Sequence, residues 1–220
     1  MAASIDQIFP AFPISGSELD SLLSMGWRHT SEYFFRMNKT NHGEEELDIL
    51  PLRIRLDNFR LSRSQQRILR KNEDLKCIIR PTQNDEEKVL LFEIHKIRFG
   101  DTAPESLGVY LSEQPGSFPC ISYEFDVRSG SNLLAVSFLD LGKVSTSAVY
   151  AMFDPAEAKR GLGIYTMLKE IEFSIKEGKE FYYPGYAYAQ SSFYDYKKNF
   201  HGLESYNWNT NEWETFTKGG

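Results

Sequence analysis

Two glycines stand where an apolar run gives way to a helical pattern, in the stretch Arg160-Gly161-Leu162-Gly163. Glycine admits positive φ and leaves the backbone bare, so N–H groups beside a helix N-terminus can point at an anion. That chemistry suits a phosphate or a terminal nucleotide, with Arg160 as an additional cation. A tight strand-to-helix turn needs the same residues, so the stretch alone leaves both interpretations open.

A row of arginines in SRSQQRILRKN is a second candidate site. Arg63, Arg67 and Arg70 recur at spacings of four and three, which places their guanidinium groups on one helix face. Residues 53–80 carry nine Lys and Arg against three Asp and Glu, although the net charge of the whole chain is −6. The rest of the chain is therefore strongly acidic. A basic segment in an acidic chain is typical of contact with a polyanion, and a solvated helix face is the alternative.

Composition excludes several classes of protein. Cys77 and Cys120 lack CxxC spacing, and the four histidines show neither HxH nor HExxH pairing, so we expect buried thiols, no metal and no cofactor. The chain has no run of about 18 uncharged apolar residues, and its N-terminus lacks the order of a signal peptide. We therefore expect a cytoplasmic protein with no membrane contact.

Hydrophobic periodicity predicts the elements that position these residues. Capping-box spacing places a helix over residues 17–25 and a second one after Ser62. The segment WRHTSEYFFRM is strand-like, and LPLRIRLDNF alternates as a half-buried strand with a basic outer face. A longer helix is expected over residues 82–99, and a short one opened by Pro104.

The pattern changes to strands from residue 121. ISYEFDV, NLLAVSFLDLG and VSTSAVYAMF, separated by short turns, predict an antiparallel meander. A helix with Ile164, Leu168 and Ile171 on one face then ends at Gly178, and the strand EFYYPGY completes a βαβ unit. A meander that leads into such a unit through a glycine turn resembles the core of GNAT acyltransferases, in which that turn holds the pyrophosphate of coenzyme A.

Aromatic residues are concentrated near the C-terminus, where residues 181–220 hold 13 of the 31 rings. Unpaired RNA bases stack on such rings beside basic groups, and core packing is the simpler role.

The chain resembles the arginyl-tRNA:protein transferases and the related bacterial leucyl-transferring enzymes in three ordered blocks: LLSMGWRHTSEYFFR, LPLRIRLDNFRLSRSQQRILRKNEDL, and a block that runs from VYAMFDPAEAKRGLGIYTMLKEI to YYPGYAYAQSSFYDYKKNFHGLE. The resemblance implies a transferase that moves an aminoacyl group, Arg or Leu, from tRNA to an amine of a protein, peptide or small molecule, the reaction behind N-degrons. The family carries a cysteine pair where this chain reads NKTNHGEEELDI.

An aminoacyl ester is already activated, and an N-terminal amine with a pKa near 7.7–8.0 is substantially neutral at cytosolic pH. The protein therefore has three tasks: to align amine and ester, to stabilise the oxyanion, and to return a proton to the ribose hydroxyl. We expect Asp154 to hold the ammonium or accept its proton, unless it caps the turn before Pro155. Tyr186, Tyr194 and Lys197 are candidates for ester orientation and proton return. The expected substrate and tRNA contacts are Arg53, Arg55, Arg63, Gln66, Arg67, Arg70, Lys71, Arg160, Gly161, Gly163 and Tyr165.

The glycine turn also predicts the effect of substitution. We expect Gly161→Val to weaken donor binding with little loss of stability. Gly163 is the less clean test, because Val in the first turn also lowers helix propensity.

The predicted fold class is α+β, with a GNAT-like mixed, largely antiparallel sheet that contains one βαβ unit, and a small N-terminal α/β part packed against it. Residues 1–80 form the N-terminal region with the basic helix, and residues 81–220 form the transferase core. Two other functions stay open. A coenzyme A-dependent N-acyltransferase would use the turn but not the arginine row, and a non-catalytic relative would only bind tRNA.

Overall fold

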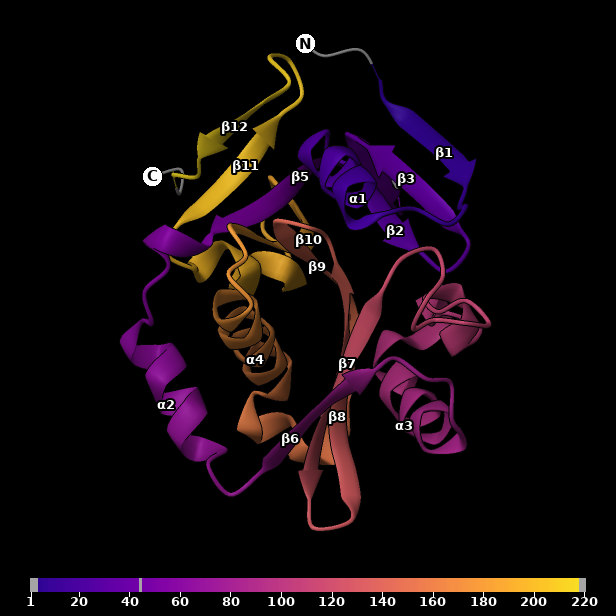
Figure 1. Ribbon diagram of the computed structural model, residues 1–220, viewed down its shortest axis with the longest axis vertical. Helices are drawn as coiled ribbons and strands as arrows, with labels where there is room; N and C mark the ends of the chain where they lie inside the picture. Colours follow the sequence, from indigo (N-terminus) through magenta and orange to yellow (C-terminus); the bar gives the residue numbers. More distant parts are fainter. Residues whose placement is uncertain (1–3, 44, 218–220) are drawn as a thin grey trace.

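The computed structural model describes residues 4–43 and 45–217, which form a large mixed sheet, a small antiparallel sheet and the helices that cover them (Figure 1). The described strands are β1 Asp6–Pro10, β2 Arg28–Thr30, β3 Tyr33–Met37, β4 Lys39–His42, β5 Glu45–Arg55, β6 Lys76–Pro81, β7 Ser122–Ser129, β8 Asn132–Leu141, β9 Ser145–Phe153, β10 Phe181–Tyr188, β11 Leu203–Asn207 and β12 Glu212–Thr215. The described helices are α1 Gly16–Ser24, η1 Leu56–Asn58, α2 Arg63–Lys71, α3 Glu86–Lys96, η2 Ile97–Thr102, η3 Leu107–Val109, η4 Pro155–Arg160, α4 Leu162–Lys176 and η5 Phe193–Asn199.

The large sheet has the order β12-β11-β5-β10-β9-β8-β7-β6, with β4 paired to β5. Strands β7, β8 and β9 form an antiparallel meander, and α4 then connects β9 to its parallel neighbour β10. The predicted meander and βαβ unit are thus confirmed, as is the mixed, largely antiparallel sheet. The parallel pairing of β9 with β10 covers only residues 145–147 and 181–183, and β10 has a bulge before Gly185.

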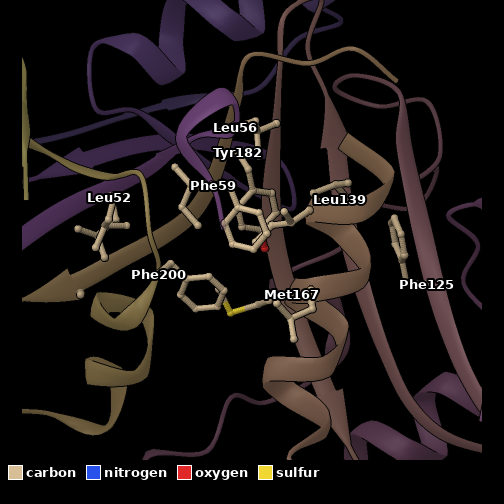
Figure 2. Close-up of a cluster of buried hydrophobic side chains, with 13 residues drawn as sticks. Leu52, Leu56, Phe59, Phe125, Leu139, Met167, Tyr182 and Phe200 are labelled. Atoms are coloured by element: carbon tan, nitrogen blue, oxygen red, sulfur yellow. The ribbon is translucent and has the colours of Figure 1, made fainter. Parts of the chain in front are cut away.

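Helix α4 packs on one face of this sheet because its apolar side chains recur at helical spacing. Met167, Leu168 and Ile171 lie against Leu139 of β8 and Tyr182 of β10, and each buried aliphatic side chain contributes about 1.5–3 kcal/mol. Figure 2 shows Tyr182, Leu139 and Met167 in this cluster, together with Phe59 and Phe200 from the segments that follow β5 and η5. Helix α2 lies outside α4 (Figure 1).

Helix α3 covers the opposite face of the sheet. Leu91 and Phe92 of α3 pack against Val136 and Phe138 of β8 and Met152 of β9. Both faces of the central strands β8 and β9 are therefore covered, by α4 on one side and α3 on the other (Figure 1).

The N-terminal part is a sheet of order β1-β3-β2 covered by α1. Leu19 and Leu23 of α1 pack with Phe34 of β3 and Tyr183 of β10, which joins this part to the large sheet. The small N-terminal α/β part is confirmed. The expected boundary at residue 80 does not follow the edge of the large sheet, because β5 and β6 are strands of it.

Two expected elements differ from the structure. The segment from residue 27 to 37 is a hairpin rather than one strand, because Ser31 has a φ of 47° and turns the chain between β2 and β3. Pro104 opens no helix; the short helix η3 begins three residues later, at Leu107.

None of the helices within the described residues has the length and apolar character needed to cross a bilayer.

Candidate active site

The glycine turn links β9 to α4 through η4. Gly161 has a φ of 70°, a conformation that favours glycine, and its carbonyl oxygen accepts hydrogen bonds from the N–H groups of Ile164 and Tyr165. Within the described residues, the N–H groups of Leu162 and Gly163 have no partner, as expected for the first turn of a helix. A Cβ atom at Gly163 would lie 3.8 Å from Cε1 of Phe153, an ordinary contact. The left-handed backbone conformation therefore explains Gly161, whereas neither conformation nor local packing requires a glycine at position 163.

Arg160, the predicted helping cation, forms ion pairs within the protein. Its guanidinium group pairs with Asp74, at 2.9 and 3.1 Å, and with Glu157 at 2.8 Å. It also donates to the carbonyl oxygen of Lys71. Arg160 therefore joins the turn to the end of α2, and its contact with a donor stays a prediction.

Helix α2 presents the predicted arginine row to solvent. Arg63, Arg67 and Arg70 are exposed, as is Gln66, and no ion pair engages any of the three arginines within the described part of the chain. Lys71 is exposed as well, and its amine donates to the carbonyl oxygen of Lys159. The capping box at Ser62 and Gln65 is present as predicted. The free guanidinium groups stay available to an external polyanion.

Arg53 and Arg55 do not form the free basic face that the strand pattern predicts. Both pair with Glu204 of the neighbouring strand β11, at 2.5 and 3.3 Å, and Arg53 lies over the rings of Phe181 and Trp213. The alternation of β5 is confirmed, but β11 neutralises its outer face. The sequence could not have revealed this pairing, because Glu204 lies about 150 residues away.

Tyr165 is buried in α4, where it packs with Leu75 and Val127. It cannot contact a ligand from this position, and we withdraw it as a binding residue. Asp154 caps η4, because its Oδ1 accepts a hydrogen bond of 2.9 Å from the N–H group of Ala156. That is the structural alternative that its position before Pro155 suggests, and its catalytic role stays a prediction.

The structure brings Lys197, Tyr186 and Tyr194 together. Nζ of Lys197 donates to the carbonyl oxygen of Tyr186 at 3.1 Å and lies 5.0 Å from the centre of the Tyr194 ring. The hydroxyl of Tyr186 donates to the carbonyl oxygen of Gly26, so this group anchors β10 to the N-terminal part. Burial, and then the nearby cation of Arg28, lower the pKa of Lys197 to about 7.

Sequence reasoning missed Arg28, which fills the gap where β9 and β10 separate. Its guanidinium group donates to the carbonyl oxygens of Ala148 in β9 and Tyr183 in β10. A Cβ atom at Gly185 would lie 3.6 Å from this guanidinium group and 3.2 Å from the amine of Lys197. We call this space between β9 and β10 the wedge. The buried Arg28 and the half-buried Lys197 meet in it.

Glu170 of α4 is the carboxyl group that faces these cations. It is buried, and its Oε2 accepts a hydrogen bond from the hydroxyl of Tyr182. Burial raises the pKa of Glu170 to about 7, against the effects of the hydroxyls of Ser137 and Tyr182 and of the cations of Lys197 and Arg28. The sequence did contain a signal for Glu170 as a functional residue, because a glutamate stands between Leu168 and Ile171 on the apolar face of the predicted helix.

Aromatic rings surround the end of β9 beside the wedge. Tyr150 stacks on Tyr110 with a centroid distance of 3.7 Å. Arg98 is exposed, lies over the rings of Phe153 and Phe193, and forms no ion pair in the part of the chain that the structure describes. Phe193 in turn contacts Tyr194. Arg98 is therefore an exposed cation in contact with the rings around Lys197.

The thiols take no part in this site. Cys120 is buried and Cys77 is half-buried; burial raises the pKa of both, that of Cys77 to about 11. No group of three or more His, Cys, Asp and Glu residues within the described range could hold a metal ion.

Comparisons with known proteins match this chain to aminoacyl transferases. Residues 83–207 match the family model described as arginine-tRNA-protein transferase, C terminus. The aspartate/glutamate leucyltransferase of Saccharophagus degradans is 30% identical over 213 residues, which cover 95% of this chain and 87% of that protein. The protein of the same name from Hahella chejuensis is 29% identical over 189 residues, with 83% and 77% covered.

Two solved structures are similar over much of the chain. L-PGS from Bacillus licheniformis has a TM-score of 0.48 at 13% identity, covering 92% of this chain and 68% of that one. FemX has a TM-score of 0.48 at 9% identity, covering 80% and 61%.

Proposed function

Because the chain belongs to the arginine-tRNA-protein transferase family, we propose that it transfers leucine from leucyl-tRNA to the N-terminal aspartate or glutamate of a protein. The names of the curated relatives support both the amino acid and the acceptor. The single observation that carries the donor assignment is the exposed arginine face of α2, which pairs with no carboxylate among the described residues and suits the phosphates of tRNA. A tRNA donor supports a cytoplasmic location.

The wedge between β9 and β10 supports a reaction at Lys197. The acceptor nitrogen attacks the ester carbonyl carbon, the bond from that carbon to the ribose oxygen breaks, and the proton of the attacking nitrogen must reach the ribose oxygen. Lys197 has a pKa of about 7 and can give and regain a proton near neutral pH. We assign it the return of the proton, with Tyr194 beside it to orient the ester.

Arg98 is the cation that we assign to the acidic acceptor. It is exposed, has no carboxylate partner within the described residues and contacts the rings around Tyr194. A charge-assisted hydrogen bond to a carboxylate is stronger than one between neutral groups, so Arg98 would favour acceptors that begin with Asp or Glu.

A coenzyme A donor is less compatible with the wedge. Arg28 already binds the carbonyl oxygens of Ala148 and Tyr183. An extended acyl donor could therefore not form strand-like hydrogen bonds with the backbone of β9 at this position.

The test is a transfer assay with leucyl-tRNA and arginyl-tRNA against peptides that begin with Glu, Asp, Ala or acetylated Glu. We expect leucine transfer to the Glu and Asp peptides and none to the acetylated one. In Arg98→Gln, transfer to the Glu peptide should fall about tenfold and transfer to the Ala peptide should not change. Arginine transfer, or equal use of all free N-termini by the wild type, would contradict the proposal.

A further inference from the structure

Helix α3 presents apolar side chains on two opposite faces. Its inner face, with Leu91 and Phe92, packs on the large sheet. On its outer face Leu90, Ile94 and Ile97 recur at spacings of four and three, with side chains 58%, 48% and 75% exposed. Ile97 extends this line because its backbone stays helical after α3 ends, with φ −54° and ψ −31°. We call these three side chains the α3 stripe; such a continuous exposed apolar line indicates contact with another molecule.

Each end of the α3 stripe carries an exposed charge, and the two charges have opposite signs. Glu86 lies in the first turn of α3 and forms no ion pair within the described residues. Arg98 follows the last residue of the stripe and likewise has no carboxylate partner in the described part of the chain. The helical rise separates these two positions by about 18 Å. The other acidic side chains of α3 are paired within the protein, Glu87 with Arg128 and Glu93 with Lys96.

The basic end of the α3 stripe adjoins the rings around Lys197. Cζ of Arg98 lies 4.7 Å from the centre of the Phe193 ring, and Phe193 contacts Tyr194. Nζ of Lys197 lies 5.0 Å from the centre of the Tyr194 ring. A polypeptide whose N-terminal amine reacts at Lys197, and whose first side chain binds Arg98, can therefore continue along α3.

The size of the α3 stripe suits an extended segment better than a second copy of the protein. A stable protein–protein interface buries about 800 Å² per partner, and three partly exposed aliphatic side chains on one helix provide only part of that area. An extended chain needs less, because it presents every second side chain to one surface. At about 3.3 Å per residue it passes from Arg98 to Glu86 in about six residues. If the first side chain binds Arg98, the third and fifth face the stripe and the seventh reaches Glu86.

We propose that the α3 stripe binds the segment of the acceptor protein that follows its N-terminal residue, in extended form. The first side chain, Asp or Glu, pairs with Arg98. Apolar third and fifth side chains lie on Leu90, Ile94 and Ile97, and a basic seventh side chain pairs with Glu86. This inference rests on the proposed function, because it takes the N-terminal acid of the acceptor as the group on Arg98.

The experiment measures KM and kcat for leucine transfer, at saturating leucyl-tRNA, to three amidated peptides. The first, Glu-Ala-Leu-Ala-Leu-Ala-Lys, has the proposed pattern; the second, Glu-Ala-Gln-Ala-Gln-Ala-Lys, lacks the apolar side chains; and the third is Glu-Ala. For the wild type, the KM for the first peptide should be about tenfold lower than for the second, with a similar kcat, because two leucine side chains leave water.

The double variant Leu90→Gln, Ile94→Gln removes the apolar contact. Both side chains are exposed and Gln favours helix nearly as well as Leu, so the fold should persist. The KM for the first peptide should rise to that for the second. Transfer to Glu-Ala and the affinity for tRNA should not change.

Glu86→Lys tests the other end of the α3 stripe. It should raise the KM for the first peptide about threefold, the size expected of an exposed ion pair. The same peptide with a seventh-position Glu in place of Lys should show the opposite change. Equal KM values for both peptides in wild type and variant would exclude Glu86 from the contact and overturn the proposed register.

The matched control is Ile175→Gln, which replaces an exposed isoleucine of α4, on the other face of the sheet. It should keep the wild-type KM for all three peptides. Equal KM values for the first two peptides in the wild type, or an unchanged KM in the double variant, would overturn the inference, whereas leucine transfer to Glu-Ala would still support the proposed function.

Two further outcomes would assign the α3 stripe to a different occupant. A lower tRNA affinity of the double variant would assign it to the donor, and a wild-type dimer in sedimentation that the variant dissociates would assign it to a second copy. Either result would overturn the inference. Absence of leucine transfer to every peptide would overturn the proposed function, and this inference with it.

Discussion

Lys197 combines an enclosed ammonium group with a pKa of about 7, and this combination predicts the pH dependence of transfer. Proton return requires the protonated form of Lys197, which is present below that pKa. The acceptor amine must be neutral, which it becomes as pH rises through about 7.7–8.0. The rate of single-turnover transfer against pH should therefore be bell-shaped.

Two substitutions test whether deprotonation of Lys197 causes the descending limb of the pH–rate profile. Lys197→Arg keeps the charge but cannot give up its proton, so the limb should disappear and the rate should fall about 10²–10⁴-fold. Glu170→Gln removes the negative charge that raises the pKa of Lys197, so the limb should move to lower pH. A Lys197→Arg enzyme with the rate and profile of the wild type would exclude Lys197 from proton return.

His29 predicts a second effect of pH, on stability rather than on transfer. Its Nδ1 lies 2.7 Å from the Asp140 carboxylate and its Nε2 lies 2.8 Å from the carbonyl oxygen of Ser31. Burial alone would lower the pKa of His29, but Asp140 raises it overall. The resulting stabilisation is complete below the unfolded pKa of about 6.5 and is lost as pH rises through the folded pKa.

Urea unfolding of wild type and His29→Gln at pH 6 and pH 8.5 measures this effect. At pH 6 the variant should have a free energy of unfolding lower by about 1–3 kcal/mol. The difference between the two proteins should shrink at pH 8.5. A difference that grows with pH would mean that His29 is buried as the neutral ring.

At the scale of elements, sequence patterns predicted what depends on local spacing. The capping boxes, the apolar face of α4 and the alternation of β5 all follow from residues close together in the chain, and the structure confirms them. Partners distant in sequence were not predictable. Glu204 neutralises Arg53, and Arg28 reaches β9 and β10, through contacts that only the assembled sheets create.

The backbone conformation of the glycine turn makes Gly163→Ala a better test of donor contact than Gly161→Val. Val at Gly161 would have to adopt a left-handed conformation, which costs about 1–2 kcal/mol, so the expected small loss of stability does not hold. Gly163 has an ordinary helical conformation with room for a methyl group, so Gly163→Ala should keep or raise stability. If the N–H group of Gly163 contacts the donor, the added methyl group of Gly163→Ala should obstruct that approach and lower tRNA affinity about tenfold. The melting temperature should be unchanged or higher. Equal affinity for wild type and Gly163→Ala would assign the turn a structural role alone.

The arginine row of α2 predicts a change in salt dependence. Reversal of the charges at Arg63, Arg67 and Arg70 should weaken tRNA binding and flatten its dependence on salt concentration, because fewer counterions are released. The fold should persist, since all three side chains are exposed and form no ion pair within the described residues. An unchanged affinity and salt slope, with circular dichroism equal to that of the wild type, would contradict the electrostatic role of α2.

At the scale of the whole molecule, helix α2 with its arginine row, the glycine turn and the wedge lie around one βαβ unit. Figure 1 shows α2 beside α4, the helix of that unit. The N-terminal part contributes Arg28 to the wedge, so the two sheets form one site rather than two independent units. Acyl donors that must extend along β9 are disfavoured by that contact. The choice of donor, aminoacyl-tRNA rather than coenzyme A, is therefore the property that most directly tests the proposed function.

The decisive measurement is a transfer assay with one peptide that begins with glutamate. The protein is incubated with this peptide in two parallel reactions, one with radiolabelled leucyl-tRNA and one with radiolabelled acetyl-CoA, and label on the peptide is measured. We predict transfer of leucine to the peptide amine, no acetylation, and no competition of acetyl-CoA with leucyl-tRNA. Acetylation of the peptide without leucine transfer would contradict the account and identify the protein as a coenzyme A-dependent acyltransferase.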